Sequence, residues 1–294
     1  MPIPGVVAPP QPGIRPAGPL AGMQVVIDSL TLNAIDPDGV AWSVADLDGW
    51  WGADTTGDSV PRPNAHGAWD APRYFAAKAI TMLGGAIVAP TPEALEAARA
   101  TLSRSIPVDR LVTLTVAEPT PKRAQVKRIG RLAVRLETDR IATWSCVVEA
   151  PDPRRYATVA QTVRTTLPDP HGGGALVPWT VPLVLGERSP AGFLTVTNEG
   201  DIDAPWTAVG TGPIDAGWAI RLGERYVAFD FAVPPGRQAA IDALNGLVTV
   251  DGAEYEGRVA RGSTWFFIPP GVSQLAVTGT GSGRVDLTAA SAWS

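Results

Sequence analysis

The segment of this sequence closest to a catalytic pattern is Gly57-Asp58-Ser59-Val60, which resembles the block around a nucleophilic serine. A serine acts as a nucleophile only when a base lies within hydrogen-bond reach. The chain has two histidines, His66 and His171, and no Asp-x-x-His pattern near its end. His171-Gly172-Gly173-Gly174 mimics an oxyanion-hole loop, but no Gly-x-Ser-x-Gly turn accompanies it. We therefore predict a loop at Gly57 and a linker at His171, and no catalytic residues.

Acidic residues and cysteine offer few ligands for a metal or a cofactor. Asp46, Asp48, Asp54 and Asp58 lack the spacing of a calcium loop, whose oxygens must converge on the ion. Turn capping explains these aspartates better. The single cysteine, Cys146, excludes an internal disulfide and a cysteine-rich metal site. The sequence thus predicts neither a metal site nor a cofactor.

The strongest charge feature is a run of basic residues with no acidic residue between them. We predict that it lies on a strand and forms either a solvated basic edge or a patch that faces a neighbouring subunit or DNA passing through a pore. Aromatic residues for base stacking are not interleaved, so sequence-specific binding of nucleic acid is not expected. The candidate interface residues of this run are Lys122, Arg123, Lys127, Arg128, Arg131 and Arg135.

The chain contains ten tryptophans, and three of them lie outside strand-like sequence. Trp50, Trp51 and Trp69 occur in Gly- and Asp-rich or loop-like segments. Exposed tryptophans mark protein interfaces or sugar-stacking sites. Trp50 and Trp51 therefore join the basic run as candidates for a subunit interface. Tryptophans of the second half are mostly core candidates, but an alternative function, a carbohydrate-binding module, follows if some line a sugar-binding face.

Length and composition favour two β-rich domains. The chain has 294 residues, of which 31 are glycine and 29 are proline, a density that helical bundles do not tolerate. A net charge of −5 argues against a generally basic nucleic-acid binder. No apolar stretch approaches the ~18 residues of a spanning helix, and the first residues lack the pattern of a signal peptide. We therefore expect no membrane insertion and no secretion signal.

The first half is expected to contain an arm and a β domain. Residues 1–21 hold seven prolines and form a Pro-rich arm that packs either on its own domain or along a neighbouring subunit. Residues 22–157 form the first domain, with one helix over 92–104. Thr91 is the expected N-cap of this helix, and Pro92 occupies its first position.

Several local boundaries follow within the first domain. Strands are expected at 124–137, with a break at Gly130, and at 141–150. Residues 55–69 contain too many turn formers for regular structure and predict a long loop. Residues 74–83 suit either a strand or a helix, which Gly84-Gly85 would end.

The second half predicts a linker and a sandwich. Residues 158–175 lose the hydrophobic pattern and form the expected linker. Residues 176–294 alternate strands with turn signals every 8–12 residues, the pattern of a β-sandwich or jelly roll. Asn245-Gly246 and Asp251-Gly252 are hairpin signals, because type I′ turns need positive φ at both central residues.

Several segments in order resemble the distal tail (Dit) protein family, also called phage tail family minor tail proteins, of bacteriophages with long flexible tails. EAPDPRRY, residues 149–156, is similar to an A-D-P-x-x-Y signature that ends the family's first domain. The Pro92-led helix and the strand LVTLTV resemble the family's inserted helix and the strand after it. Residues 193–205 resemble the T-N-x-G-x-x-x-x-P turn that opens its galectin-like domain. Its closing segments are similar to residues 261–265, 268–271 and 292–293.

The resemblance implies a mainly β fold: an N-terminal β-barrel or sandwich-like ring domain with one inserted helix, then a galectin-like β-sandwich. It implies a structural virion protein, a hexameric ring adaptor between the tail tube and the tail-tip or baseplate hub and fibres of a siphovirus. Expected partners are further copies of the chain, the tail tube protein, the tape measure protein, and hub or fibre proteins. The expected location is the tail tip of the virion, after synthesis in the host cytoplasm. No glycan site transfers, because no galectin sugar-contact motif is recognisable.

Overall fold

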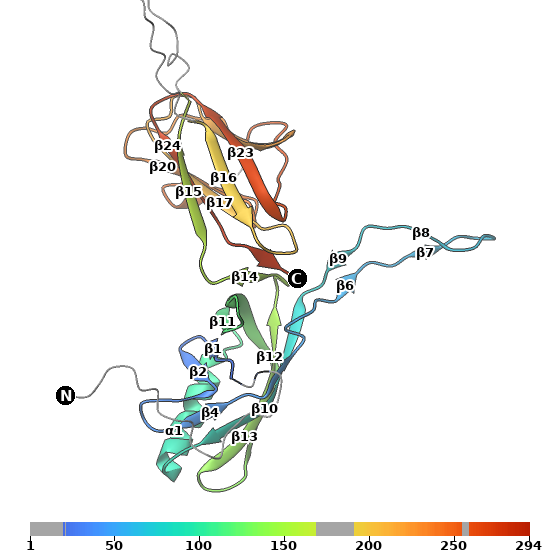
Figure 1. The fold of residues 1–294 in the computed structure, drawn as a ribbon, viewed down its shortest axis with the longest axis vertical. Helices are drawn as coiled ribbons and strands as arrows, with labels where there is room; N and C mark the ends of the chain where they lie inside the picture. Colours follow the sequence, from blue (N-terminus) through green and yellow to red (C-terminus); the bar gives the residue numbers. More distant parts are fainter. Residues whose placement is uncertain (1–19, 21, 169–190, 255–258) are drawn as a thin grey trace, which may run out of the picture. The chain divides into compact units, whose positions relative to one another are not determined.

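The computed structural model describes residues 20, 22–168, 191–254 and 259–294, and the chain forms two compact units (Figure 1). The first unit comprises Met1–Thr158 together with Ser294, and the second comprises Val159–Trp293. The Pro-rich arm lies outside the described residues except for Leu20, which is buried in the core of the first unit.

The first unit is built on an antiparallel sheet with the strand order β2-β1-β11-β12-β13-β10-β4-β3; β5 also pairs with β10, and β14 with β12. Two smaller pairs, β6 with β9 and β7 with β8, lie outside it. The strands are β1 (Val25–Ile27), β2 (Leu30–Leu32), β3 (Ala34–Ile35), β4 (Ala41–Ser43), β5 (Asp46–Asp48), β6 (Thr55–Thr56), β7 (Val60–Pro61), β8 (Ala68–Trp69), β9 (Tyr74–Phe75), β10 (Lys78–Val88), β11 (Val112–Val116), β12 (Lys122–Leu136), β13 (Ile141–Ala150) and β14 (Arg155–Ala157).

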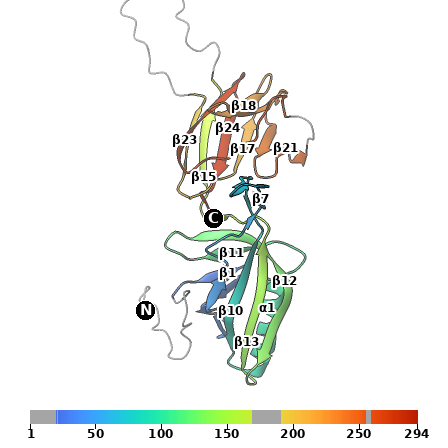
Figure 2. The same cartoon turned by 90° about the vertical axis from the view of Figure 1, so that its right-hand side faces the viewer.

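The helix α1 (Pro92–Ser105) packs on one face of this sheet (Figure 2). Thr91 has extended backbone, and its hydroxyl accepts a hydrogen bond of 3.2 Å from the backbone N–H of Ala94. Leu95 and Leu102 are buried from this helix, and they share one hydrophobic core with the strands. The predicted cap and first position are thus the observed ones, and the helix ends one residue beyond the predicted end.

Gly84-Gly85 does not end the preceding segment, as the sequence suggested. Strand β10 continues through both glycines to Val88, with a bulge between Met82 and Gly85 in its pairing with β13. A Cβ on Gly85 would lie 2.3 Å from the ring of Trp144. The glycine pair therefore serves a bulge and a close contact with an indole ring rather than a strand end.

The second unit is a β-sandwich of a six-stranded and a four-stranded antiparallel sheet. The six-stranded sheet has the order β15-β24-β17-β20-β21-β22, and the four-stranded sheet has the order β16-β23-β18-β19. The strands of these two sheets are β15 (Gln161–Thr166), β16 (Phe193–Asn198), β17 (Trp206–Thr211), β18 (Trp218–Leu222), β19 (Arg225–Phe229), β20 (Gln238–Asp242), β21 (Leu247–Val250), β22 (Ala253–Glu254), β23 (Gly271–Gly279) and β24 (Arg284–Ala289). A further short strand, β25 (Ala292–Trp293), belongs to neither sheet.

The sandwich begins earlier than the sequence indicated. Strand β15 lies inside the predicted linker 158–175 and pairs along its whole length with β24. Its alternation is weak, because Val163 is the single apolar residue on the inward face and the buried inward residue Thr165 is polar. Residues 169–175, including the His171 segment, lie outside the described residues.

One core fills the space between the two sheets. Trp206 and Trp218 are almost fully buried there. The indole Nε1 of Trp206 donates a hydrogen bond of 3.0 Å to the carbonyl of Phe266. Trp218 packs against Gly210, where an added Cβ would lie 2.5 Å from its ring nitrogen. The prediction that these two tryptophans are core residues is confirmed.

Candidate assembly surfaces

Glu118 is the centre of a buried charged network in the first unit. Its Oε1 accepts a hydrogen bond of 2.5 Å from the indole Nε1 of Trp50, and its Oε2 accepts one of 2.7 Å from Lys122 Nζ. Arg155 completes the network, with Nη1 3.6 Å from Glu118 Oε1 and its guanidinium 5.7 Å from the centre of the Trp50 ring. Buried charges persist only when they are paired and hydrogen-bonded, so this network has a structural role.

The expectation that Trp50 is an exposed interface residue is therefore wrong. Its side chain is fully buried, while the neighbouring Trp51 is 44% exposed. Lys122 is also largely removed from solvent, with a side chain 13% exposed. Glu118, which binds both groups, lies 68 residues from Trp50 in the sequence, so no local pattern indicated the burial.

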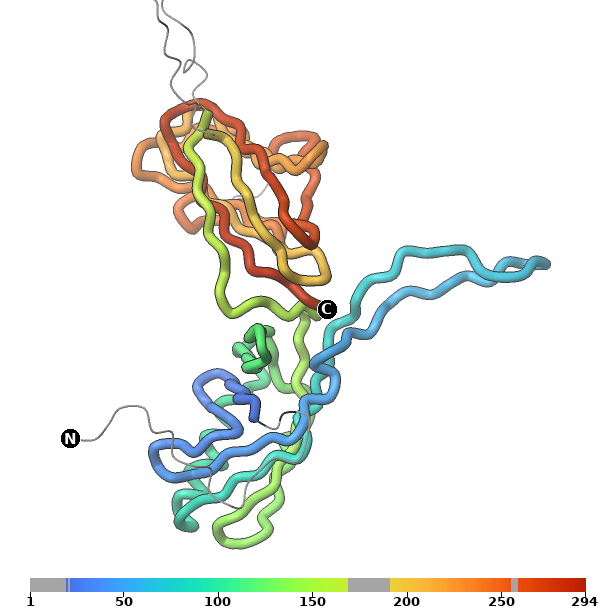
Figure 3. The backbone as a smooth tube through the Cα atoms, viewed as in Figure 1, coloured from blue at the N-terminus to red at the C-terminus, as the bar shows by residue number. Residues whose placement is uncertain are grey.

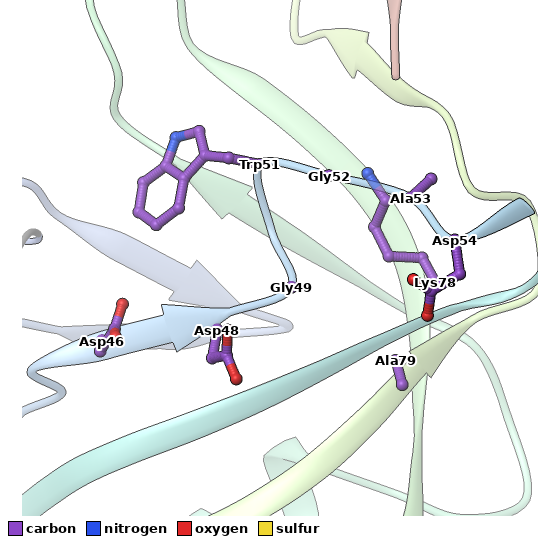
Figure 4. Close-up of a pocket in the computed structure, with 9 residues that line it drawn as sticks. All are labelled: Asp46, Asp48, Gly49, Trp51, Gly52, Ala53, Asp54, Lys78 and Ala79. Atoms are coloured by element: carbon purple, nitrogen blue, oxygen red, sulfur yellow. The ribbon is translucent and has the colours of Figure 1, made fainter.

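Trp51 lines a surface hollow of about 600 Å³ in the first unit. Figure 4 shows Asp46 and Asp48 on β5 and Asp54 beside Lys78. The remaining lining residues are Gly49, Gly52, Ala53 and Ala79. In the part of the chain that the structure describes, no group of three or more acidic, histidine or cysteine residues is arranged to hold a metal ion.

Residues 55–75, predicted as a loop followed by an ambiguous segment, form a long β-hairpin that we call the hairpin arm. It projects away from the sheet of its own unit (Figure 3). Thr55 and Thr56 pair with Phe75 and Tyr74 near its base. Further out, β7 pairs with β8. The many turn formers of this segment therefore build a narrow two-stranded ribbon instead of an irregular loop.

The hairpin arm presents apolar side chains to solvent along its length. Val60, Trp69, Tyr74 and Phe75 are 59%, 58%, 71% and 44% exposed. Near the tip, the guanidinium of Arg62 lies 4.9 Å from the centre of the Trp69 ring. A two-stranded hairpin is marginally stable alone in water, and exposed aromatic clusters mark interaction sites. The arm thus has the character of a segment that another surface covers.

The serine that resembled a nucleophile lies on the hairpin arm. Ser59 is exposed, and its hydroxyl accepts a hydrogen bond of 2.9 Å from Arg73 Nη2. A guanidinium stays protonated and cannot act as a base. This contact ties the two strands of the arm together.

The basic run lies on one strand, whose two halves have different pairing partners. All six residues belong to β12, which has β11 and β13 as neighbours. A bulge between Ile129 and Ala133, at Gly130 with a φ of 72°, divides the strand. Before the bulge the basic side chains are half-buried, whereas Arg131 and Arg135 after it are exposed. Residues 122–126 pair with β11, whereas residues 127–136 pair with β13 alone. The part of the run that carries Arg131 and Arg135 is therefore an exposed edge, as one of the two interpretations of the sequence expected, and the first part is partly covered.

Acidic residues outside the run offset part of its charge. Lys127 lies directly opposite Glu149 on β13, and Arg135 Nε is 3.4 Å from Glu137 Oε1. Among the described residues, no acidic side chain forms an ion pair with Arg123 or Arg131. These two arginines remain the clearest candidates for contact with another molecule.

The EAPDPRRY segment forms a hydrogen-bonded corner. The hydroxyl of Tyr156 donates to Asp152 Oδ2, and Asp152 Oδ1 accepts hydrogen bonds of 3.2 and 3.1 Å from the backbone N–H and Nη1 of Arg154. Burial and the Asp152 charge raise the pKa of Tyr156, so its hydroxyl stays a donor. The signature residues therefore shape the chain where β13 ends.

The comparisons with known proteins rest on structure. No family model and no curated protein matches the sequence. One match is the crystal structure of the Dit protein (gp 19.1) of phage SPP1, described as a paradigm of the hub adsorption apparatus of phages that infect Gram-positive bacteria. The two structures align with a TM-score of 0.62 and 11% sequence identity, over 90% of this chain and 98% of the SPP1 chain. No helix among the described residues is long and apolar enough to cross a membrane.

Two structures of the phage P2 baseplate in its activated conformation give a second match. The calcium form has a TM-score of 0.53 at 10% identity, and the strontium form has 0.53 at 9%. Each covers 90% of this chain and 97% of the other. The resemblance in the sequence is confirmed at the level of the fold: this chain has the mainly β fold of a phage distal tail, or Dit, protein.

Proposed function

We propose that this chain is a structural virion protein that forms a homohexameric ring at the distal end of a phage tail. There it joins the tail tube to the hub, baseplate and fibres. The shared fold supports a tail role, because the similar structures are those of a hub protein and a baseplate. The order of the sequence motifs supports the same role.

The hairpin arm carries the proposal of self-association. It exposes aromatic rings on a ribbon too thin to have a core of its own. In a ring of identical subunits related by rotation, each subunit makes the same contact with the next one. Every hairpin arm in a closed ring is therefore covered by the same surface of a neighbouring subunit. We infer that each arm lies on the neighbouring subunit, with Trp69 and Tyr74 buried in the contact.

The basic residues supply a second proposed contact. Arg123 and Arg131 face a neighbouring subunit or the channel of the ring. The tail tube protein and the tape measure protein are proposed to bind along the ring axis, and hub or fibre proteins to bind at its distal side. These partners follow from the resemblance and require separate binding experiments.

Native mass spectrometry of the purified full chain, with negative-stain images, tests self-association. We expect six-fold rings with an open centre for the wild-type protein. Trp69→Ser combined with Tyr74→Ser is expected to give monomers, because it removes two exposed rings without touching the core. The matched control is Phe193→Ser, which removes a ring that is 50% exposed in the second unit and is expected to leave the rings intact.

Two results would contradict the proposal. A double variant that still forms rings would exclude the arm as the main contact. A wild-type chain that remains monomeric both alone and when mixed with the tail tube protein would refute the adaptor function.

A further inference from the structure

The four-stranded sheet of the second unit differs in charge from the rest of the chain. Its strands β16, β18, β19 and β23 contain no aspartate or glutamate, although the chain as a whole has a net charge of −5. Their basic residues are Arg221 and Arg225. The strands of this sheet therefore carry no negative side chains on an acidic protein, and Glu224 lies in the turn that joins β18 to β19.

Four residues form one row across the outer face of this sheet. Phe193 lies opposite Ala276, Ala276 opposite Arg221, and Arg221 opposite Tyr226. The sequence neighbours of these residues lie in the core, so strand alternation directs the row outward. At strand spacings of 4.7–4.9 Å, Phe193 and Arg221 are about 10 Å apart.

The row contains an exposed aromatic ring, that of Phe193, and a guanidinium, that of Arg221, which packs on a tyrosine ring. Phe193 is 50% exposed at one edge of the sheet, and Ala276 provides a low floor beside it. The guanidinium of Arg221 lies 5.0 Å from the centre of the Tyr226 ring, which limits its freedom. Arg221 is nevertheless exposed, so its outer N–H groups remain accessible to a ligand.

Two neutral polar residues lie beside the row. Thr195 and Gln274 are opposite each other on β16 and β23, two positions from Phe193 and Ala276. Within the described residues, neither side chain makes a hydrogen bond. The face thus combines a stacking ring, a free amide, a free hydroxyl and a guanidinium around a small residue.

This combination matches the chemistry of a charged sugar. A sugar ring has an apolar C–H face that packs on an aromatic ring, and hydroxyls around its rim that need donors and acceptors. A guanidinium binds a carboxylate through two parallel hydrogen bonds. The core of a protein–protein interface is enriched in large aromatic residues and methionine and depleted in alanine, whereas the centre of this row is the small side chain of Ala276.

We propose that the outer face of this sheet binds an anionic saccharide. Phe193 stacks on a sugar ring, Gln274 and Thr195 bond its hydroxyls, and Arg221 binds a carboxylate of the same or the next sugar. The absence of acidic side chains from the four strands favours an anionic ligand over a cationic one. This binding is additional to the proposed ring and does not depend on it.

Polygalacturonate tests the proposal, with dextran as its uncharged counterpart. Binding of the full chain to each polymer is measured by microscale thermophoresis at several salt concentrations. We expect binding to polygalacturonate and at least tenfold weaker binding to dextran. Phe193→Ala and Arg221→Gln should each weaken the binding about tenfold or more, as expected for loss of a stacked ring or a charge-assisted hydrogen bond.

The control variants remove the same chemistry elsewhere in the second unit. Arg225→Gln removes an equal charge from the same sheet outside the row, and Trp265→Ala removes another exposed ring. Both are expected to bind polygalacturonate as the wild type does, and unchanged thermal unfolding verifies the fold of every variant.

Several results would overturn the inference. These are absence of polygalacturonate binding, equal binding of dextran, binding that survives both row variants, or an equal loss with Arg225→Gln. Phe193→Ala is expected to leave ring formation unchanged, so failure of the saccharide site and failure of the ring are separate outcomes.

Discussion

Replacing Asn198 by alanine removes four hydrogen bonds from one corner of the second unit. Its Nδ2 donates to the carbonyls of Ile202 and Ile268 at 2.8 and 3.0 Å. Its Oδ1 accepts from the backbone N–H groups of Gly200 and Ala292 at 3.0 and 3.2 Å. At a net contribution of about 1 kcal/mol per bond, the loss is about 4 kcal/mol. The variant no longer orders the asparagine side chain on folding, and this gain in entropy offsets about 1 kcal/mol of the loss. We therefore expect the second unit to be destabilised by about 3 kcal/mol.

Hydrogen exchange of the full chain, followed by mass spectrometry, measures this change within the second unit. A chain of two units need not unfold in one step, so a local readout is required. Peptides from β17 and β24 should lose about 100-fold in protection, as about 3 kcal/mol implies. Peptides from β13 in the first unit should be unchanged.

Asn198→Asp is the matched variant. It keeps both accepted hydrogen bonds, loses the two donated ones and places a carboxyl at a buried position. Burial raises the pKa of such a carboxyl, so this variant should be less destabilised at low pH and more so as pH rises. A loss below 1 kcal/mol for Asn198→Ala, or equal losses in both units, would refute the assignment of this corner.

Three further predictions concern the first unit. Gly85→Ala should destabilise the first unit by about 2 kcal/mol, measured by hydrogen exchange of β13 peptides, because the Trp144 ring beside the added Cβ is buried. Gly52→Ala, with nothing within 4 Å of the added Cβ, should be nearly neutral, and equal effects of the two variants would refute this reasoning. Burial raises the pKa of the Cys146 thiol from 9.0 to about 12. A thiol reagent at pH 8 should therefore react with it only after unfolding, and rapid labelling of the native protein would contradict this. Because the unfolded chain loses the thiol proton at lower pH than the folded chain does, stability should fall as pH rises from 9 towards 12. Arg123→Glu with Arg131→Glu should abolish the rings in native mass spectrometry without lowering thermal stability, and intact rings would exclude these residues from the contacts.

Local signals in the sequence were sufficient for many of the elements. Thr91 and Pro92 define the start of α1 through a cap and a missing N–H, both properties of adjacent residues. Strand β13 matches the expected segment 141–150 because its alternation is strong. The order of the motifs also led to the correct fold. The motif Thr197-Asn198-Glu199-Gly200 contains both residues that form this corner. Asn198 accepts a hydrogen bond from the backbone of Ala292, and Gly200 packs against the same residue.

Other features depend on residues that meet only in the folded chain. Trp50 looked like an interface residue because its neighbours are Gly and Asp, yet Glu118 and Arg155 enclose it. Part of the charge of the basic run is offset by Glu118 and Glu137, which form ion pairs with Lys122 and Arg135. Composition near a residue indicates the preferences of the backbone, whereas burial and net charge depend on what packs against it. Tertiary structure therefore decided which tryptophans and arginines remain available for assembly.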